Sequence, residues 1–119
     1  MERQYRLTRS VDFARVRKQG RTWSHPLVIL SVDRGEGNRK RFGFIVGRRI
    51  GRAVVRNRVK RQLREAVRRH LGEAPAGWDM VLIARAPIAE AAFAEIEDAV
   101  AQLLRRARAW IAERGAAVE

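Results

Sequence analysis

Arginine and lysine recur every four residues along one part of this chain. The series consists of Arg56, Lys60, Arg64 and Arg68, within a segment (residues 39–69) that has thirteen basic residues and one acidic residue. That segment holds +12 of the formal net charge of +13. Clustered positive side chains repel one another unless a polyanion neutralises them. Because bound phosphates release counterions and favour clustered lysine and arginine, the pattern predicts a nucleic-acid-binding surface.

Side chains that could catalyse a reaction by themselves are scarce. The chain has no cysteine, which excludes thiol nucleophiles and cysteine-ligated metals and is typical of a reducing cytosol. His25 and His70 are far apart, and no Ser–His–Asp or HExxH pattern is present. Glu95, Glu97 and Asp98 lie beside an apolar stripe, where a solvated helix face is the common arrangement. We therefore expect a binding protein with no catalytic residue, no metal ligand and no cofactor of its own.

A helix over residues 53–70 is expected to position the basic series. One side of this helix is apolar at helical spacing and is expected to face the core. This stripe consists of Val55, Val59, Leu63, Ala66 and Val67. The basic loop 47–51 precedes the helix, so its backbone N–H groups could receive a phosphate. His70, at the helix end, is interpreted as a packing or capping residue.

The remaining elements follow from apolar runs and turn residues. A first helix is expected over residues 10–19, with Ser10 as its N-cap and Gly20 as a left-handed stop. A last helix is expected over residues 91–113, followed by a disordered tail over about 115–119. Strands are expected over residues 21–23, 27–32, 41–46 and 79–84.

This order, α-β-β-β-α-β-α, predicts one α+β domain over residues 1–119, a sandwich of helices against a small mixed sheet. The apolar run at residues 27–30 is too short to cross a bilayer. The first residues lack the apolar stretch of a secretion signal. We therefore expect a cytoplasmic protein without membrane contact.

Residues 47–65 closely resemble the signature of the bacterial ribonuclease P protein subunit. Arg56-Asn57-Arg58, followed by Lys60-Arg61 and Arg64, is the hallmark of that family. Leu7 with Asp12-Phe13 resembles the start of the family's N-terminal helix, and residues 83–87 resemble its strand exit before the last helix. The similarity extends over about residues 7–110.

The resemblance implies a ribosomal-protein-like fold with a left-handed β-α-β crossover through the basic helix. Members of the family bind a catalytic RNA, and together they remove the 5′ leader from precursor tRNA. The implied activity is therefore an endoribonuclease whose active site belongs to the RNA. The implied partners are ribonuclease P RNA and precursor tRNA, with Mg²⁺ needed by the RNA.

The resemblance also implies which residues bind each partner. The basic helix and its loop would face the catalytic RNA, through Arg48, Arg49, Arg52, Arg56, Asn57, Arg58, Lys60, Arg61 and Arg64, and Arg68 continues the same basic series. The leader would lie in a cleft between the first helix and the sheet, at Phe13, Arg17 and Arg85. Arg17 and Leu30 stand where the family often has aromatic residues. This cleft is therefore expected to depend more on arginine charge and less on stacking.

Two other classes of protein share a basic helix. A ribosomal or other RNA-binding protein without a role in cleavage differs only in lacking the extended motif. A DNA-reading helix presents Asn, Gln or Ser beside its arginines. Only Asn57 and Gln62 qualify here, so DNA is not an expected partner.

Overall fold

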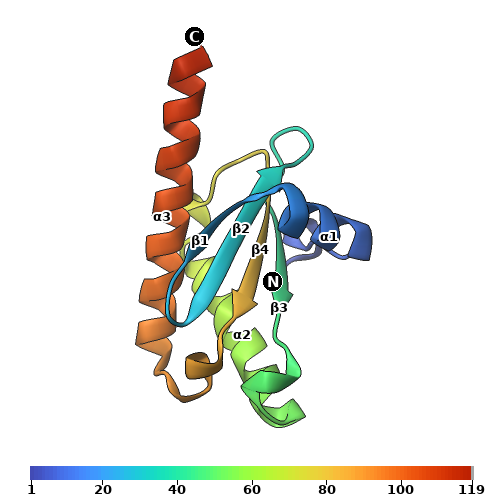
Figure 1. The fold of residues 1–119 in the computed structure, drawn as a ribbon, viewed down its shortest axis with the longest axis vertical. Coiled ribbons are helices and arrows are strands. Elements are labelled where there is room, and N and C mark those ends of the chain that lie inside the picture. Colours follow the sequence, from blue (N-terminus) through green and yellow to red (C-terminus); the bar gives the residue numbers. More distant parts are fainter. Residues whose placement is uncertain (119) are drawn as a thin grey trace.

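Four strands form one mixed sheet in the computed structural model, which describes residues 1–118 (Figure 1). The strands are β1 (Arg21–Ser24), β2 (Val28–Arg34), β3 (Arg41–Ile45) and β4 (Trp78–Ala84). Their order is β1-β2-β4-β3. β2 is antiparallel to β1 and β4, whereas β3 is parallel to β4.

Three helices cover the two faces of this sheet: α1 (Ser10–Gln19), α2 (Ala53–Arg69) and α3 (Phe93–Val118). α2 and α3 pack on one face, and α1 lies against the other (Figure 1). Short 3-10 turns are η1 (Arg3–Tyr5), η2 (Arg48–Ile50), η3 (Leu71–Glu73) and η4 (Ala86–Glu90). The connection from β3 through α2 to β4 is left-handed (Figure 1). The predicted α+β sandwich is confirmed.

The last helix is longer than expected. α3 continues to Val118, past residue 113, because Gly115 costs a helix only about 1 kcal/mol relative to alanine and alanines follow it. Glu119 lies outside the described residues, and the disordered tail over 115–119 stays a prediction. Within residues 1–118, no helix is long and apolar enough to span a membrane.

Strand alternation divides the core between the two faces. Leu30 and Leu82 face α2 and α3, in the larger cluster that also holds Leu63. Val81 points the opposite way, into a small cluster with Val16 of α1. Leu30 is therefore on the wrong face to line a cleft beside α1, and the expectation that it marks that cleft is wrong. Successive strand residues alternate faces, so its neighbours in β2 point toward α1 instead.

Both expectations for the ends of α1 are wrong. Ser10 is the first helical residue, and the N-cap is Arg9, which makes no side-chain capping bond. Gly20 has extended backbone with φ −77°. Glycine is needed there for a different reason. A Cβ would lie 2.3 Å from the Val16 carbonyl oxygen and 2.6 Å from that of Val32.

A buried ion network ties α1 to the sheet. The carboxylate of Asp79, in β4, is fully buried and accepts hydrogen bonds from Arg15 of α1 and from Arg41 of β3. The Arg41 Nε and Nη2 atoms lie 2.9 and 2.8 Å from its two oxygens. These bonds raise the pKa of Arg41 above its ordinary value despite partial burial. Arg15 also binds Asp33 at 2.6 Å.

Candidate RNA interface

α2 has the two faces that its sequence predicts. Val59, Leu63, Ala66 and Val67 are buried, and Val55 packs partly against the same core. On the other flank the predicted RNA-facing residues reach the surface to different degrees. Arg52, Asn57 and Arg61 are exposed, whereas Arg56, Lys60 and Arg64 are half-buried.

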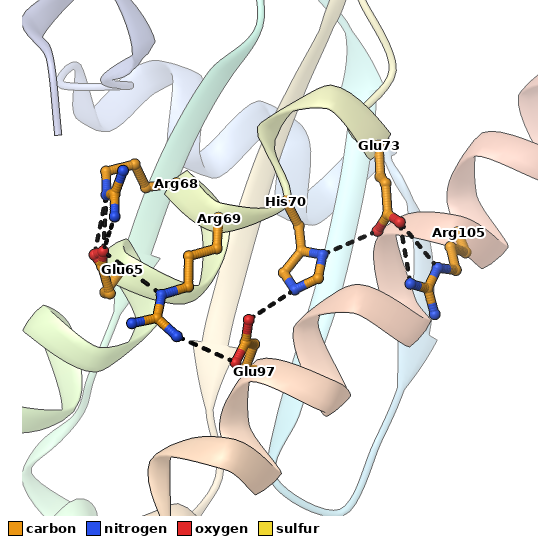
Figure 2. Close-up of polar contacts among 7 residues, drawn as sticks. All are labelled: Glu65, Arg68, Arg69, His70, Glu73, Glu97 and Arg105. Carbon is orange, nitrogen blue, oxygen red and sulfur yellow. Dashed lines mark hydrogen bonds and ion pairs between the residues drawn. The ribbon is translucent and has the colours of Figure 1, made fainter.

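Two members of the predicted set are engaged within the protein. The Arg58 Nη2 atom donates to the carbonyl oxygen of Ala89 at 2.5 Å, which ties α2 to η4. Arg68 donates to both carboxylate oxygens of Glu65, with Nε 2.8 Å from Oε1 (Figure 2). Hydrogen bonding to Arg68 lowers the pKa of Glu65 below its usual range. Both arginines therefore have a partner inside the protein, Glu65 one turn away on α2 for Arg68 and the Ala89 carbonyl of η4 for Arg58.

The loop before α2 brings two residues predicted to bind the catalytic RNA next to one predicted to bind the leader. Arg48 and Arg49 are exposed on η2, which the buried side chain of Ile50 anchors. These two arginines line a cavity of about 490 Å³ together with Arg85, the predicted leader-binding residue that follows β4. Three arginines from two distant segments therefore surround one space large enough for a nucleotide.

Phe13 lies on the open part of the sheet, half-buried against the small cluster of α1. A Cβ on Gly43 would lie 2.4 Å from its ring, so glycine allows the ring to rest directly on β3. Ile45 and Ile83 pack in the same cluster and also line the 490 Å³ cavity. They connect Phe13 to Arg85. Arg17 is exposed on α1, and no cavity described here joins it to either residue.

Arg6 is a basic residue near this surface that sequence reasoning missed. It lines a cavity of about 220 Å³ with Phe13, Lys60 and Arg64. A β-bridge between Arg6 and Phe42 brings the N-terminal segment to the edge of β3. No local signal in the sequence indicates this placement, because Arg6 is far from the basic segment and only chain pairing brings them together.

An ion network at the C-terminal end of α2 connects this helix to α3 (Figure 2). His70 Nδ1 lies 3.2 Å from Glu73, and its Nε2 lies 3.1 Å from Glu97 of α3. Arg69 also contacts Glu97, and Arg105 lies 3.0 Å from Glu73. Burial raises the pKa of Glu73, but hydrogen bonding and charge from Arg105 outweigh it, so that pKa is lowered.

This network confirms His70 as a capping residue and corrects the interpretation of Glu97. His70 does occupy the C-cap position of α2, but its ring lies between two carboxylates instead of packing on the core. Glu97 joins α3 to α2 and is not simply part of a solvated face. Within the part of the chain that the structure describes, no three His, Cys, Asp or Glu side chains are grouped to hold a metal ion.

The two faces of α2 predict opposite outcomes for neighbouring substitutions. Leu63→Ala removes a fully buried side chain and is expected to lower the free energy of unfolding by about 2–5 kcal/mol. Arg64→Ala removes a side chain of the basic flank and is expected to change it far less. Denaturant unfolding of both variants measures the difference. Equal losses would show that the two faces are wrongly assigned.

Known proteins have sequences similar to this chain over most of its length. A family profile described as Ribonuclease P matches residues 1–108. The ribonuclease P protein component of Herpetosiphon aurantiacus is 48% identical over 110 residues, which cover 92% of this chain and 89% of that protein.

Solved structures agree with the sequence comparison. The RNase P protein of Staphylococcus aureus matches with a TM-score of 0.79 at 29% identity, over 87% of this chain and 94% of that one. The RNase P protein of Thermotoga maritima matches with a TM-score of 0.78 at 30% identity, over 85% of this chain and 96% of that one.

Proposed function

Because this chain belongs to the ribonuclease P protein family, we propose that the basic flank of α2 and the η2 turn bind the catalytic RNA of that enzyme. The chain is a protein subunit of ribonuclease P and acts in the 5′ maturation of tRNA. The residues proposed to bind RNA are Arg48, Arg49, Arg52, Arg56, Asn57, Arg58, Lys60, Arg61, Arg64 and Arg68.

One observation carries this assignment. Seven cations of the α2 flank and η2 have no carboxylate partner among the described residues. By contrast, Arg69 at the end of α2 is ion-paired, as are Arg15, Arg41 and Arg105 elsewhere in the fold. The seven are Arg48, Arg49, Arg52, Arg56, Lys60, Arg61 and Arg64. Unpaired guanidinium groups present planar sets of N–H donors that match phosphate oxygens.

The catalytic centre of the holoenzyme is proposed to lie in the RNA. The basic segment has one carboxylate, Glu65, and Arg68 holds it. The protein would then act by binding and positioning, while Mg²⁺ serves the RNA, and no residue of this chain is assigned to the metal. The enzyme would work in the cytoplasm, on precursor tRNA.

The test is precursor-tRNA cleavage by a bacterial ribonuclease P RNA at low Mg²⁺ concentration. The protein is expected to stimulate cleavage. Arg48→Gln combined with Arg49→Gln is expected to weaken that stimulation, whereas the same charge removed at Lys18 and Arg108 is not. An RNA-binding protein without a role in cleavage would bind RNA but leave the rate unchanged, and this result would overturn the proposal.

The 5′ leader of the substrate is proposed to lie between α1 and the sheet, against Phe13, Arg17 and Arg85. The half-buried ring of Phe13 can stack on an unpaired base, which contributes about 1–3 kcal/mol per base. Arg85 would receive leader phosphate in the cavity that it shares with Arg48 and Arg49.

Leader length provides the measurement for this second site. Phe13→Ala and Arg17→Ala are expected to weaken holoenzyme binding to a precursor tRNA with a leader of several nucleotides. Binding of a precursor with a one-nucleotide leader should be nearly unchanged, because it does not reach the groove. An equal loss for both substrates, or a loss of thermal stability large enough to explain it, would show that Phe13 packs in the core and does not bind the leader.

A further inference from the structure

All three tryptophans of the chain meet at one place. Trp110 of α3 makes edge-to-face contacts with Trp23 of β1 and Trp78 of β4, with ring centroids 5.7 and 6.1 Å apart. Trp23 is buried, whereas Trp78 and Trp110 are half-buried. The rings therefore complete the core where α3 crosses the end of the sheet, and parts of two of them remain at the surface.

Three exposed arginines lie over these rings. The Arg21 guanidinium carbon is 5.7 Å from the Trp23 centroid and 5.6 Å from that of Trp110. Arg114 lies 4.7 Å from the Trp110 centroid, and Arg34 lies 5.7 Å from the Trp78 centroid. We call these six side chains the Trp–Arg cluster. Contact with the ring faces restrains the guanidinium groups and leaves their in-plane N–H donors free.

No carboxylate within the described residues forms an ion pair with Arg21, Arg34 or Arg114. Other arginines of the fold do have such partners, for example Arg105 with Glu73. Arg21 and Arg114 also share one ring, so two like charges are held near each other without a neutralising group. Such an arrangement is unfavourable alone and becomes favourable when an anion bridges the two groups.

The cluster is separate from the interface on α2. Trp78 begins β4 and Arg85 follows its other end, so the two sites are roughly 20 Å apart along the strand. The side chains of Arg21 and Trp23 lie on the α3 side of the sheet, whereas the proposed leader groove lies on the α1 side. A leader in that groove does not reach the cluster, but a large folded RNA can contact both ends of a molecule 47 Å long.

We propose that the Trp–Arg cluster is a second binding site for backbone phosphates of the catalytic RNA, with Arg21, Arg34 and Arg114 as the contacting residues. This inference rests on the proposed function. Binding at two separated sites would hold the RNA in one orientation on the protein, because the second contact forms without a further loss of free translation.

The test is the salt dependence of affinity for ribonuclease P RNA. Removing two phosphate contacts by Arg21→Gln and Arg114→Gln is expected to flatten the slope of log K against log salt by between one and two units. Arg21→Lys with Arg114→Lys keeps the charge and should restore most of the slope. Lys18→Gln with Arg108→Gln is the charge-matched control. The Arg108 guanidinium lies 3.5 Å from the Gly72 carbonyl oxygen, and helical spacing puts residues 108 and 110 on different sides of α3. Thermal unfolding of each variant is recorded beside the binding.

Each outcome decides the question. If the glutamine variant has the slope of the control, or if the lysine variant fails to restore the slope while remaining folded, the cluster only packs α3 and the inference is overturned. If the slope changes only for a holoenzyme with long-leader substrate, the phosphates belong to the leader and the assignment to the catalytic RNA is wrong. Failure of the unaltered protein to bind the RNA would instead overturn the proposed function.

Discussion

The affinity of this protein for ribonuclease P RNA is expected to fall about 10³–10⁵-fold between 50 and 200 mM salt, if roughly 6–10 phosphate contacts form. Seven cations of α2 and η2 without carboxylate partners provide contacts in that range. Each contact that forms releases condensed counterions, and this release is less favourable when the bulk salt concentration is already high. Equilibrium binding over a series of salt concentrations gives the slope directly.

Single substitutions on α2 show which contacts contribute. Arg61→Gln, on the exposed flank, is expected to flatten the slope by about one unit or slightly less. Arg68→Gln is the matched comparison on the same helix and should change it less, because Glu65 already neutralises that side chain. An affinity that hardly changes over the salt series contradicts the phosphate-contact interpretation.

Asp79→Asn is expected to lower the free energy of unfolding by about 3 kcal/mol. The substitution keeps the shape of the side chain but removes the charge that Arg15 and Arg41 share. Asp79 is fully buried, and the two arginines are partly exposed, so water can compensate them in part. Two guanidinium groups are then left facing each other around a neutral amide.

Denaturant unfolding of the variant measures this loss. Asp98→Asn is the control, because Asp98 is exposed and its side-chain contact is a hydrogen bond from Gln102 on α3. Exposed substitutions of this kind usually change stability by less than about 0.5 kcal/mol. If both variants lose the same small amount, the Asp79 network does not hold α1 on the sheet.

The spacing of apolar, basic and turn residues along the chain predicted most of the fold. The apolar stripe of α2 and the order of helices and strands depend on the spacing of neighbouring residues, and that spacing is visible in the chain itself. The ends of elements were less predictable. Gly20 was expected to be a left-handed stop, but its role is to let the backbone pass close to Val16 and Val32. The approach to Val32 exists only after β1, which begins at the next residue, has paired with β2.

The sequence by itself determined that a basic helix face binds a polyanion, because charge density and helical period are properties of adjacent residues. The tertiary structure alone decided which cations are available. Arg58 and Arg68 have internal partners, and pairing of the N-terminal segment with β3 brings Arg6 to Lys60 and Arg64. The Trp–Arg cluster also joins residues from β1, β2, β4 and α3. Contacts between residues far apart in the chain depend on strand order and packing, which leave no mark in any short window of sequence.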